Sequence, residues 1–287
     1  MFYKNTASMR FMGSLDNYDL AEVVIVGAPM DFTCSFRPGT RFGPQKIREV
    51  STGIEEYSVY MQQSLEDKKY FDAGDLDLPF GNVERSLQII SSACGQIYAD
   101  NKFPLFIGGE HIVSLPLIEQ AYKKYGDDMV LLHFDAHADL REDYMGECHS
   151  HASVIRKVCE FMKGDSIYQF GIRSGTKEEM QFAKENTNMY LFEVVKPFME
   201  QIEKIEHRPI YVTMDIDVVD PAFANGTGTP EPGGCSSKEI LKVASEMKRL
   251  NVIGFDLVEV SPHYDNSDRT ALLAAKIIRE MILSVKK

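Results

Sequence analysis

The sequence predicts an α/β protein, built as a three-layer α/β/α sandwich around a central, mainly parallel sheet of eight strands. Short runs rich in β-branched and aromatic residues alternate with longer helix-like segments along the chain, which is typical of β-α-β units. No internal repeat, low-complexity tract or Gly/Ser-rich linker interrupts this alternation. A chain of 287 residues with 44% hydrophobic residues is long enough to bury one large core. We therefore expect a single domain that spans residues 1–287.

The expected strands and helices follow one another in strict alternation. Eight segments are short, apolar and rich in β-branched or aromatic residues, and we expect strands at residues 23–30, 70–73, 103–107, 129–134, 167–171, 189–192, 209–214 and 252–258. Longer segments after each strand are expected to form helices at residues 43–50, 83–98, 111–125, 149–162, 176–185, 196–205, 236–250 and 267–283. Because one helix follows each strand, neighbouring strands can be joined as parallel β-α-β units.

The composition restricts where the protein works and what it binds. The formal net charge of −12 disfavours nucleic acid and anionic membranes as partners, and mildly favours a cationic ligand. No apolar run approaches the ~18 residues of a membrane span, and residues 1–6 lack the basic-then-apolar pattern of a signal peptide. The five cysteines form no Cys-x-x-Cys pair, so neither a disulfide framework nor a zinc ribbon is indicated. We expect a cytoplasmic protein with reduced thiols.

An imidazole or a carboxylate occupies every second position from His133 to Asp139, directly after an apolar run. Side chains at positions i and i+2 of an extended chain point the same way, with Cα atoms ~6.5 Å apart. On this basis we expect Asp135, His137 and Asp139 to converge. His133 lies earlier in the strand and is expected to be a hydrogen-bonded core histidine rather than a ligand.

Further polar residues occur at or just past the carboxyl ends of other expected strands, namely His111, Asp215, Asp217 and Glu259. Open parallel sheets bind ligands in the crevice outside these strand ends. Asp215 and Asp217 also have the i, i+2 spacing that turns side chains to one side. We therefore expect four segments that are distant in sequence to meet at one edge of the sheet.

A cluster of aspartates at that edge predicts a metal centre. Neighbouring carboxylates raise one another's pKa unless cations neutralise them. Two divalent ions would balance four aspartates, and two imidazoles would complete the ligand shell. A water shared by two such ions becomes a hydroxide nucleophile near neutral pH. Carboxylate and imidazole donors without thiolates favour Mn²⁺, with Fe²⁺, Co²⁺ or Zn²⁺ as alternatives. The candidate ligands are His111, Asp135, His137, Asp139, Asp215 and Asp217.

Five ordered motifs resemble the ureohydrolase family of arginases and agmatinases, and most of all its agmatinase branch. They are Gly-Gly-Glu-His at 108–111, Asp-Ala-His-Ala-Asp at 135–139, Ser-His at 150–151, Asp-Ile-Asp at 215–217, and the glycine-rich loop at 226–234. Segments 27–31 and 37–44 extend the resemblance over essentially the whole chain. The resemblance implies the arginase/deacetylase fold, two Mn²⁺ ions per subunit and assembly into trimers or hexamers. The implied reaction is hydrolysis of agmatine, a small cationic guanidino substrate, to putrescine and urea.

The resemblance also implies roles for individual residues. Glu259 would bind the guanidinium, in the fork geometry that a planar cation makes with a carboxylate. Asp139 would carry the first proton to the leaving nitrogen, and His151 would relay protons to and from solvent. His149, two residues earlier, is an alternative shuttle. Each ion would have one imidazole and one carboxylate of its own, with two shared carboxylates: His111 with Asp139, His137 with Asp217, and Asp135 with Asp215 as the bridges.

Substrate choice rests on the loops around the centre. Thr229 and Glu231 are expected to face the substrate pocket. Residues 140–144 lack the asparagine and small hydroxylated residues with which arginases bind an amino-acid carboxylate, which favours agmatine over arginine. Arg141 could instead bind a carboxylate, as guanidinobutyrate would require. Four acidic side chains offer negative charge to a terminal amine: Glu142, Asp143, Glu147 and Glu231.

Two alternatives to agmatine hydrolysis stay open. The first is a related hydrolase acting on guanidinobutyrate, arginine or formiminoglutamate. The second is a non-catalytic metal-binding regulator of polyamine metabolism. The presence of Glu259 and His151 argues against the regulator, because a scaffold has no need of either side chain.

Overall fold

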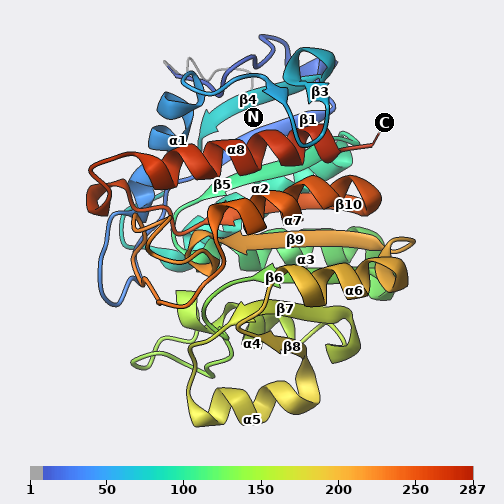
Figure 1. The fold of residues 1–287 in the computed structure, drawn as a ribbon. Coiled ribbons are helices and arrows are strands. Elements are labelled where there is room, and N and C mark those ends of the chain that lie inside the picture. Colours follow the sequence, from blue (N-terminus) through green and yellow to red (C-terminus); the bar gives the residue numbers. More distant parts are fainter. Residues whose placement is uncertain (1–8, 287) are drawn as a thin grey trace.

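The computed structural model describes residues 9–286 as one eight-stranded sheet covered on both faces by helices (Figure 1). Its strands are β1 (Val23–Ala28), β4 (Tyr70–Asp75), β5 (Phe103–Gly108), β6 (Val130–Phe134), β7 (Ile167–Ile172), β8 (Asn188–Leu191), β9 (Pro209–Asp215) and β10 (Asn251–Val258). Their order is β4-β1-β5-β10-β9-β6-β7-β8, and every neighbouring pair is parallel. The predicted three-layer sandwich and all eight expected strands are confirmed.

Helices on the two faces enclose separate hydrophobic cores. One face carries α1 (Gly43–Ser51), α6 (Val195–Ile205), α7 (Ser237–Glu246) and α8 (Arg269–Ser284). The other carries α2 (Val83–Ala99), α3 (Ser114–Tyr125) and α4 (Val154–Val158), with α5 (Lys177–Asn186) beside the edge strand β8. Along β5, Leu105 and Ile107 pack into the first core and Phe106 into the second. Burial on both faces explains why the strands are continuous apolar runs. Within residues 9–286, no helix has both the length and the apolar character needed to cross a membrane.

Two local features differ from the expectation. The helix expected at residues 149–162 is much shorter, because α4 covers only Val154–Val158 after a 3-10 turn at His151–Ser153. The Ser150 N–H donates to Ser153 Oγ at 3.1 Å, and this local bond starts the turn after residue 149. A small antiparallel hairpin, β2 (Tyr57–Ser58) with β3 (Gln63–Ser64), was not expected. Strands of two residues are too short to show a sequence period.

The sheet order brings the expected site segments together. The strands β5, β10, β9 and β6 are consecutive neighbours at the centre of the sheet. His111 follows the end of β5, Glu259 follows β10, Asp215 ends β9, and Asp135 follows β6. Because all four strands are parallel, their carboxyl ends lie at the same edge. The predicted meeting of these segments at one edge is confirmed.

Candidate metal centre

Residues 135–139 converge just past the end of β6. The strand β6 itself ends at Phe134. Asp135 Oδ1 accepts a hydrogen bond from the His137 N–H at 2.6 Å, and His137 forms a parallel bridge with Ser174 after β7. Asp139 adopts the left-handed conformation, with a φ of 53°, which is uncommon for a residue other than glycine. The expected convergence is therefore confirmed: Asp135 shares one ligand group with Asp139 and the other with His137.

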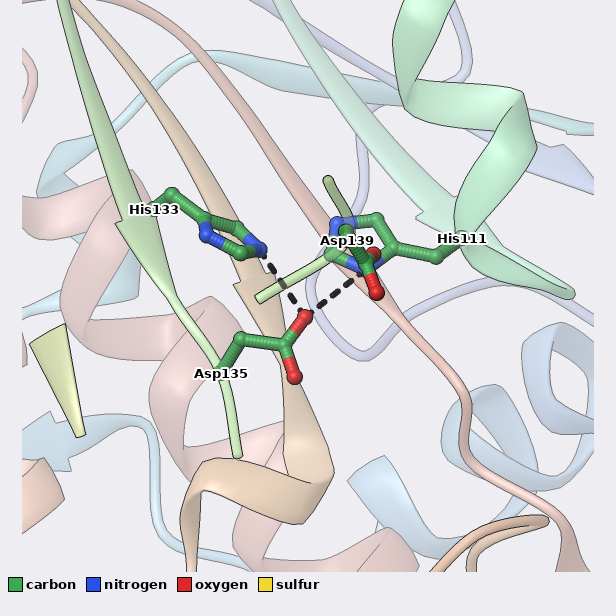
Figure 2. Close-up of side chains that lie close together, drawn as sticks. All are labelled: His111, His133, Asp135 and Asp139. Carbon is green, nitrogen blue, oxygen red and sulfur yellow. Dashed lines mark hydrogen bonds and ion pairs between the residues drawn. The ribbon is translucent and has the colours of Figure 1, made fainter. Parts of the chain in front are cut away.

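The first group of potential ligands consists of four buried residues, His111, His133, Asp135 and Asp139 (Figure 2). His111 Nδ1 lies 3.0 Å from Asp135 Oδ2 and 3.0 Å from Asp139 Oδ2. On the other side of the ring, His111 Nε2 lies 3.0 Å from Thr213 Oγ1, which donates to Asp256 Oδ1 at 2.7 Å. Because the Thr213 hydroxyl proton is used in that bond, its oxygen can only accept from His111, and His111 Nε2 must carry a proton. The lone pair on Nδ1 therefore faces the two carboxylates, as in a metal-binding histidine whose other nitrogen is held by an outer partner.

Two buried atoms in this group have no hydrogen-bond partner among the described residues, namely His111 Nδ1 and Asp139 Oδ2. They are close to each other, but their geometry does not make a hydrogen bond. Buried polar atoms almost always have a partner, so such a pair requires an explanation. An imidazole lone pair and a carboxylate oxygen that face one small space fit a bound cation. The residues present are thus suited to a metal ion.

The second group consists of Asp135, His137 and Asp217. His137 Nδ1 lies 3.0 Å from Asp217 Oδ2 and 3.5 Å from Asp135 Oδ1. Asp135 therefore belongs to both groups, with Oδ2 toward the first and Oδ1 toward the second. Asp215 lies beside them: its Oδ2 is 3.5 Å from His111 Nδ1, and its Oδ1 accepts from the Asp217 N–H at 2.8 Å. The structure thus brings all six candidate ligands together.

The carboxylates of the two groups compete electrostatically. Burial raises the pKa of Asp215 well above its usual value, and repulsion from Asp217 and Asp135 adds to this effect. Burial would also raise the pKa of Asp135, but neighbouring imidazoles, beginning with His133, outweigh it and hold that pKa well below the usual value. Burial would lower the pKa of His111, whereas the adjacent carboxylates raise it well above normal. Divalent cations would relieve this competition by neutralising the carboxylates directly.

His133 belongs to the first group, but its hydrogen bonds make it a donor (Figure 2). The Gln169 side-chain N–H donates to the Ala138 carbonyl at 2.8 Å, which fixes the orientation of the amide. The same nitrogen lies 3.1 Å from His133 Nδ1, so Nδ1 accepts and the proton resides on Nε2. His133 Nε2 then donates to Asp135 Oδ2 at 2.9 Å. The prediction of a hydrogen-bonded core histidine is confirmed.

Glu259 presents a buried carboxylate next to the ligand groups. Its backbone is left-handed, with a φ of 66°, and its N–H donates to the Gly109 carbonyl at 2.8 Å. Oε1 accepts from the His111 N–H at 2.8 Å. Burial, with a contribution from Glu110, raises the pKa of Glu259 to about 8. A buried carboxylate of this kind is suited to a cationic ligand.

His151 lines the same cavity as the ligands. Ser35 Oγ lies 3.3 Å from Nε2, Thr33 Oγ1 lies 3.4 Å from Nδ1, and the Tyr144 ring makes an edge contact at 5.6 Å between centroids. Burial lowers the pKa of His151 below its usual value. His149 lines a different surface cavity, on the side of α2 and α3. This arrangement favours His151 over His149 as the histidine that serves the site.

The cavity above the two groups has a volume of about 300 Å³. Thr229 lines it, and its Oγ1 lies 3.3 Å from Asp217 Oδ2. Glu231 is not among the described residues that line it, and its carbonyl accepts from Arg173. Three further acidic residues that could meet a substrate amine are exposed and also lie outside the lining: Glu142, Asp143 and Glu147.

One charged residue of the lining was not expected. Glu179, in the first turn of α5, is buried and lines the cavity. The sequence offered a local signal at this position, because Thr176 and Glu179 have the spacing of a capping box and form one. That signal predicts the start of a helix. It contains no information on which part of the molecule the carboxylate faces.

The fold and the two ligand groups define a metal-dependent α/β enzyme, and comparison with known proteins gives its family. The sequence profile of the Arginase family matches residues 21–284. The agmatinase of Bacillus anthracis is 54% identical over 276 residues, covering 95% of each chain. The agmatinase of Bacillus subtilis strain 168 is 52% identical over 280 residues, covering 96% of each chain. The agmatine ureohydrolase structure from Thermoplasma volcanium superposes with a TM-score of 0.88 at 30% identity, covering 96% of this chain and 94% of that one. The chain belongs to the arginase family.

Proposed function

We propose that this enzyme hydrolyses agmatine to putrescine and urea at a centre of two Mn²⁺ ions. The observation that carries the proposal is the pair of unpartnered buried atoms, His111 Nδ1 and Asp139 Oδ2, on the same cavity as the buried Glu259 carboxylate. An imidazole and carboxylate centre beside a cation-binding carboxylate suits hydrolysis of a guanidinium. The agmatinases at 54% and 52% identity support agmatine as that guanidinium.

The donor set supports both the number and the type of ions. Asp135 contributes one oxygen to each ligand group, as a bridging carboxylate would. Both groups contain only imidazole nitrogens and carboxylate oxygens, a combination that suits Mn²⁺ better than thiophilic metals. One ion would be held by the first group and one by the second. The proposed ligands are His111 with Asp139, His137 with Asp217, and Asp135 with Asp215 shared.

The side chains around the centre would divide the remaining work. Two bound ions supply an activated water and positive charge for the reaction. Glu259 would orient the guanidinium through paired N–H donors. Asp139 would pass a proton to the nitrogen that departs as the C–N bond breaks. His151, between Thr33 and Ser35, would relay protons between the site and solvent.

The proposal is tested by measuring steady-state urea release from agmatine, arginine and guanidinobutyrate, with protein reconstituted in Mn²⁺. We expect agmatine to give the largest kcat/KM. Formamide release from formiminoglutamate, without urea from agmatine, would indicate the related hydrolase instead. Urea from none of these guanidines, despite two bound Mn²⁺ ions, would favour the metal-binding regulator.

Replacing His133 with phenylalanine is expected to weaken Mn²⁺ binding without changing the number of ions bound at saturation. The change removes the Nε2 donor that orients Asp135, and loss of such an outer partner typically costs ~10–100-fold in metal affinity. Calorimetric titration of metal-free protein with MnCl₂ measures this effect, with the exposed His207→Phe as control. A saturating content of one ion would instead show that His133 is itself a ligand.

Replacing His151 with asparagine is expected to lower kcat for agmatine by roughly 10²-fold, the lower range for a general acid–base group, while Mn²⁺ content stays at two. His149→Asn is a matched control, because that histidine lies two residues away and lines a different cavity. Metal analysis and initial-rate kinetics test the pair. Equal rates for the two variants would remove His151 from the proton relay.

A further inference from the structure

We infer that the ion pair between Arg141 and Glu179 determines which charge the cavity accepts at the far end of the substrate. This inference rests on the proposed function, because it concerns the group that trails the guanidinium. Apart from the histidines, the proposed ligands and Glu259, the charged residues described in the cavity lining are Arg141 and Glu179. Their charges are opposite. The wall that they form can therefore attract either an ammonium or a carboxylate, depending on which of the two side chains the substrate meets.

Glu179 is the fixed member of the pair. Its side chain is 5% exposed, Oε1 accepts from the Leu140 N–H at 3.0 Å, and Oε2 accepts from the Thr176 N–H at 2.8 Å. The Leu140 N–H belongs to the chain directly after residues 135–139, so this carboxylate is anchored to the centre. A carboxylate held by two backbone donors cannot swing away from the cavity. It offers a permanent acceptor to an ammonium group.

Arg141 is the more accessible member. Its side chain is 38% exposed, Nε lies 3.7 Å from Glu179 Oε2, and the guanidinium lies 5.1 Å from the centroid of the Tyr144 ring. This separation from Glu179 is longer than a hydrogen bond, so the guanidinium donors are left available for a carboxylate. Tyr144 in turn contacts His151. Arg141 therefore connects the tail-binding wall to the proposed proton relay.

The two charges have opposite effects on substrate choice. Glu179 favours agmatine, whose tail is an ammonium, and Arg141 favours guanidinobutyrate, whose tail is a carboxylate. Removing Arg141 leaves Glu179 uncompensated, which favours the ammonium and repels the carboxylate. A tail charge that meets a charge of the opposite or the same sign in the cavity wall changes the selectivity between substrates. Arg141 thus limits the preference for agmatine that Glu179 creates.

The test compares three substrates that share a guanidinium and a four-carbon tail and differ in the terminal group and its charge: agmatine, guanidinobutyrate and the neutral butylguanidine. We expect Arg141→Gln to raise kcat/KM for agmatine relative to butylguanidine, and to lower that for guanidinobutyrate relative to butylguanidine. The ratio of agmatine to guanidinobutyrate should rise by about 10-fold or more. Arg141→Lys retains the charge and should keep the ratio within about 3-fold of the wild type. Glu179→Gln, checked for folding by circular dichroism, should lower the ratio.

Equal losses on all three substrates in Arg141→Gln would overturn the inference, because they would show that Arg141 only supports Tyr144 and His151. A ratio unchanged within about 2-fold would overturn it as well. These outcomes differ from failure of the proposed function. If the proposed function is wrong, wild-type protein with two Mn²⁺ ions releases no urea from agmatine, and the inference about Arg141 and Glu179 is then wrong as well.

Discussion

Asp135→Asn is expected to lower urea formation from agmatine by more than about 10²-fold and to reduce the Mn²⁺ content below two ions per chain. The change removes the one carboxylate that both ligand groups share. Asparagine has nearly the same shape as aspartate but cannot accept the same hydrogen bonds. His133 Nε2–H donates to one oxygen of Asp135, and the His137 N–H donates to the other. No orientation of an amide accepts both bonds, so one buried donor is left unpaired at a cost of about 1–3 kcal/mol. The expected loss exceeds the ~10–100-fold that outer partners cause.

Metal analysis and urea assays of the Asp135 variant test this prediction. Glu142→Gln is the matched control, because it also removes one carboxylate from the segment after β6, at an exposed position outside the cavity. We expect the control to bind two ions and to turn over normally. Full Mn²⁺ content in Asp135→Asn would contradict a bridging role for Asp135.

Glu259→Gln is expected to lower kcat/KM for agmatine by about 10²–10⁴-fold while leaving two Mn²⁺ ions bound. Glu259 is the buried carboxylate that would pair with the guanidinium, and removing one member of a buried ion pair costs about 3–5 kcal/mol. Oε1 accepts from the His111 N–H, and a glutamine oxygen can accept the same bond, so the fold should be retained. Kinetics and metal analysis together distinguish this result from damage to the centre.

Glu231→Gln provides the control for Glu259. Glu231 was expected to face the substrate, but it is not among the described residues that line the cavity. We therefore expect its substitution to leave kcat/KM for agmatine within about 3-fold of the wild type. A large loss would show that the loop around Glu231 closes over the substrate. A normal rate in Glu259→Gln would remove that carboxylate from guanidinium binding.

The parts of the site that sequence analysis predicted well are those that depend on strand ends. His111, Asp215 and Glu259 each end or follow an apolar strand, and the parallel sheet brings their segments to one edge. Prediction was weaker where side-chain direction depends on distant hydrogen bonds. The segment after Phe134 is an example, because the Ala138 N–H donates to the Ser174 carbonyl at 3.1 Å, from the strand-end loop after β7. No local pattern in the sequence encodes that contact.

The sequence by itself determined the alternation of strands and helices, the set of acidic and imidazole side chains at the strand ends, and the need for positive charge among them. These properties follow from short-range effects, namely hydrophobic periodicity and the mutual repulsion of carboxylates. The tertiary structure alone decided that β5, β10, β9 and β6 are neighbours. It also decided that Glu179 lies beside Arg141 in the cavity wall and that Glu231 is not among the described residues of the lining. Strand order and loop direction depend on contacts between residues far apart in the chain, and such contacts form only when the whole core packs.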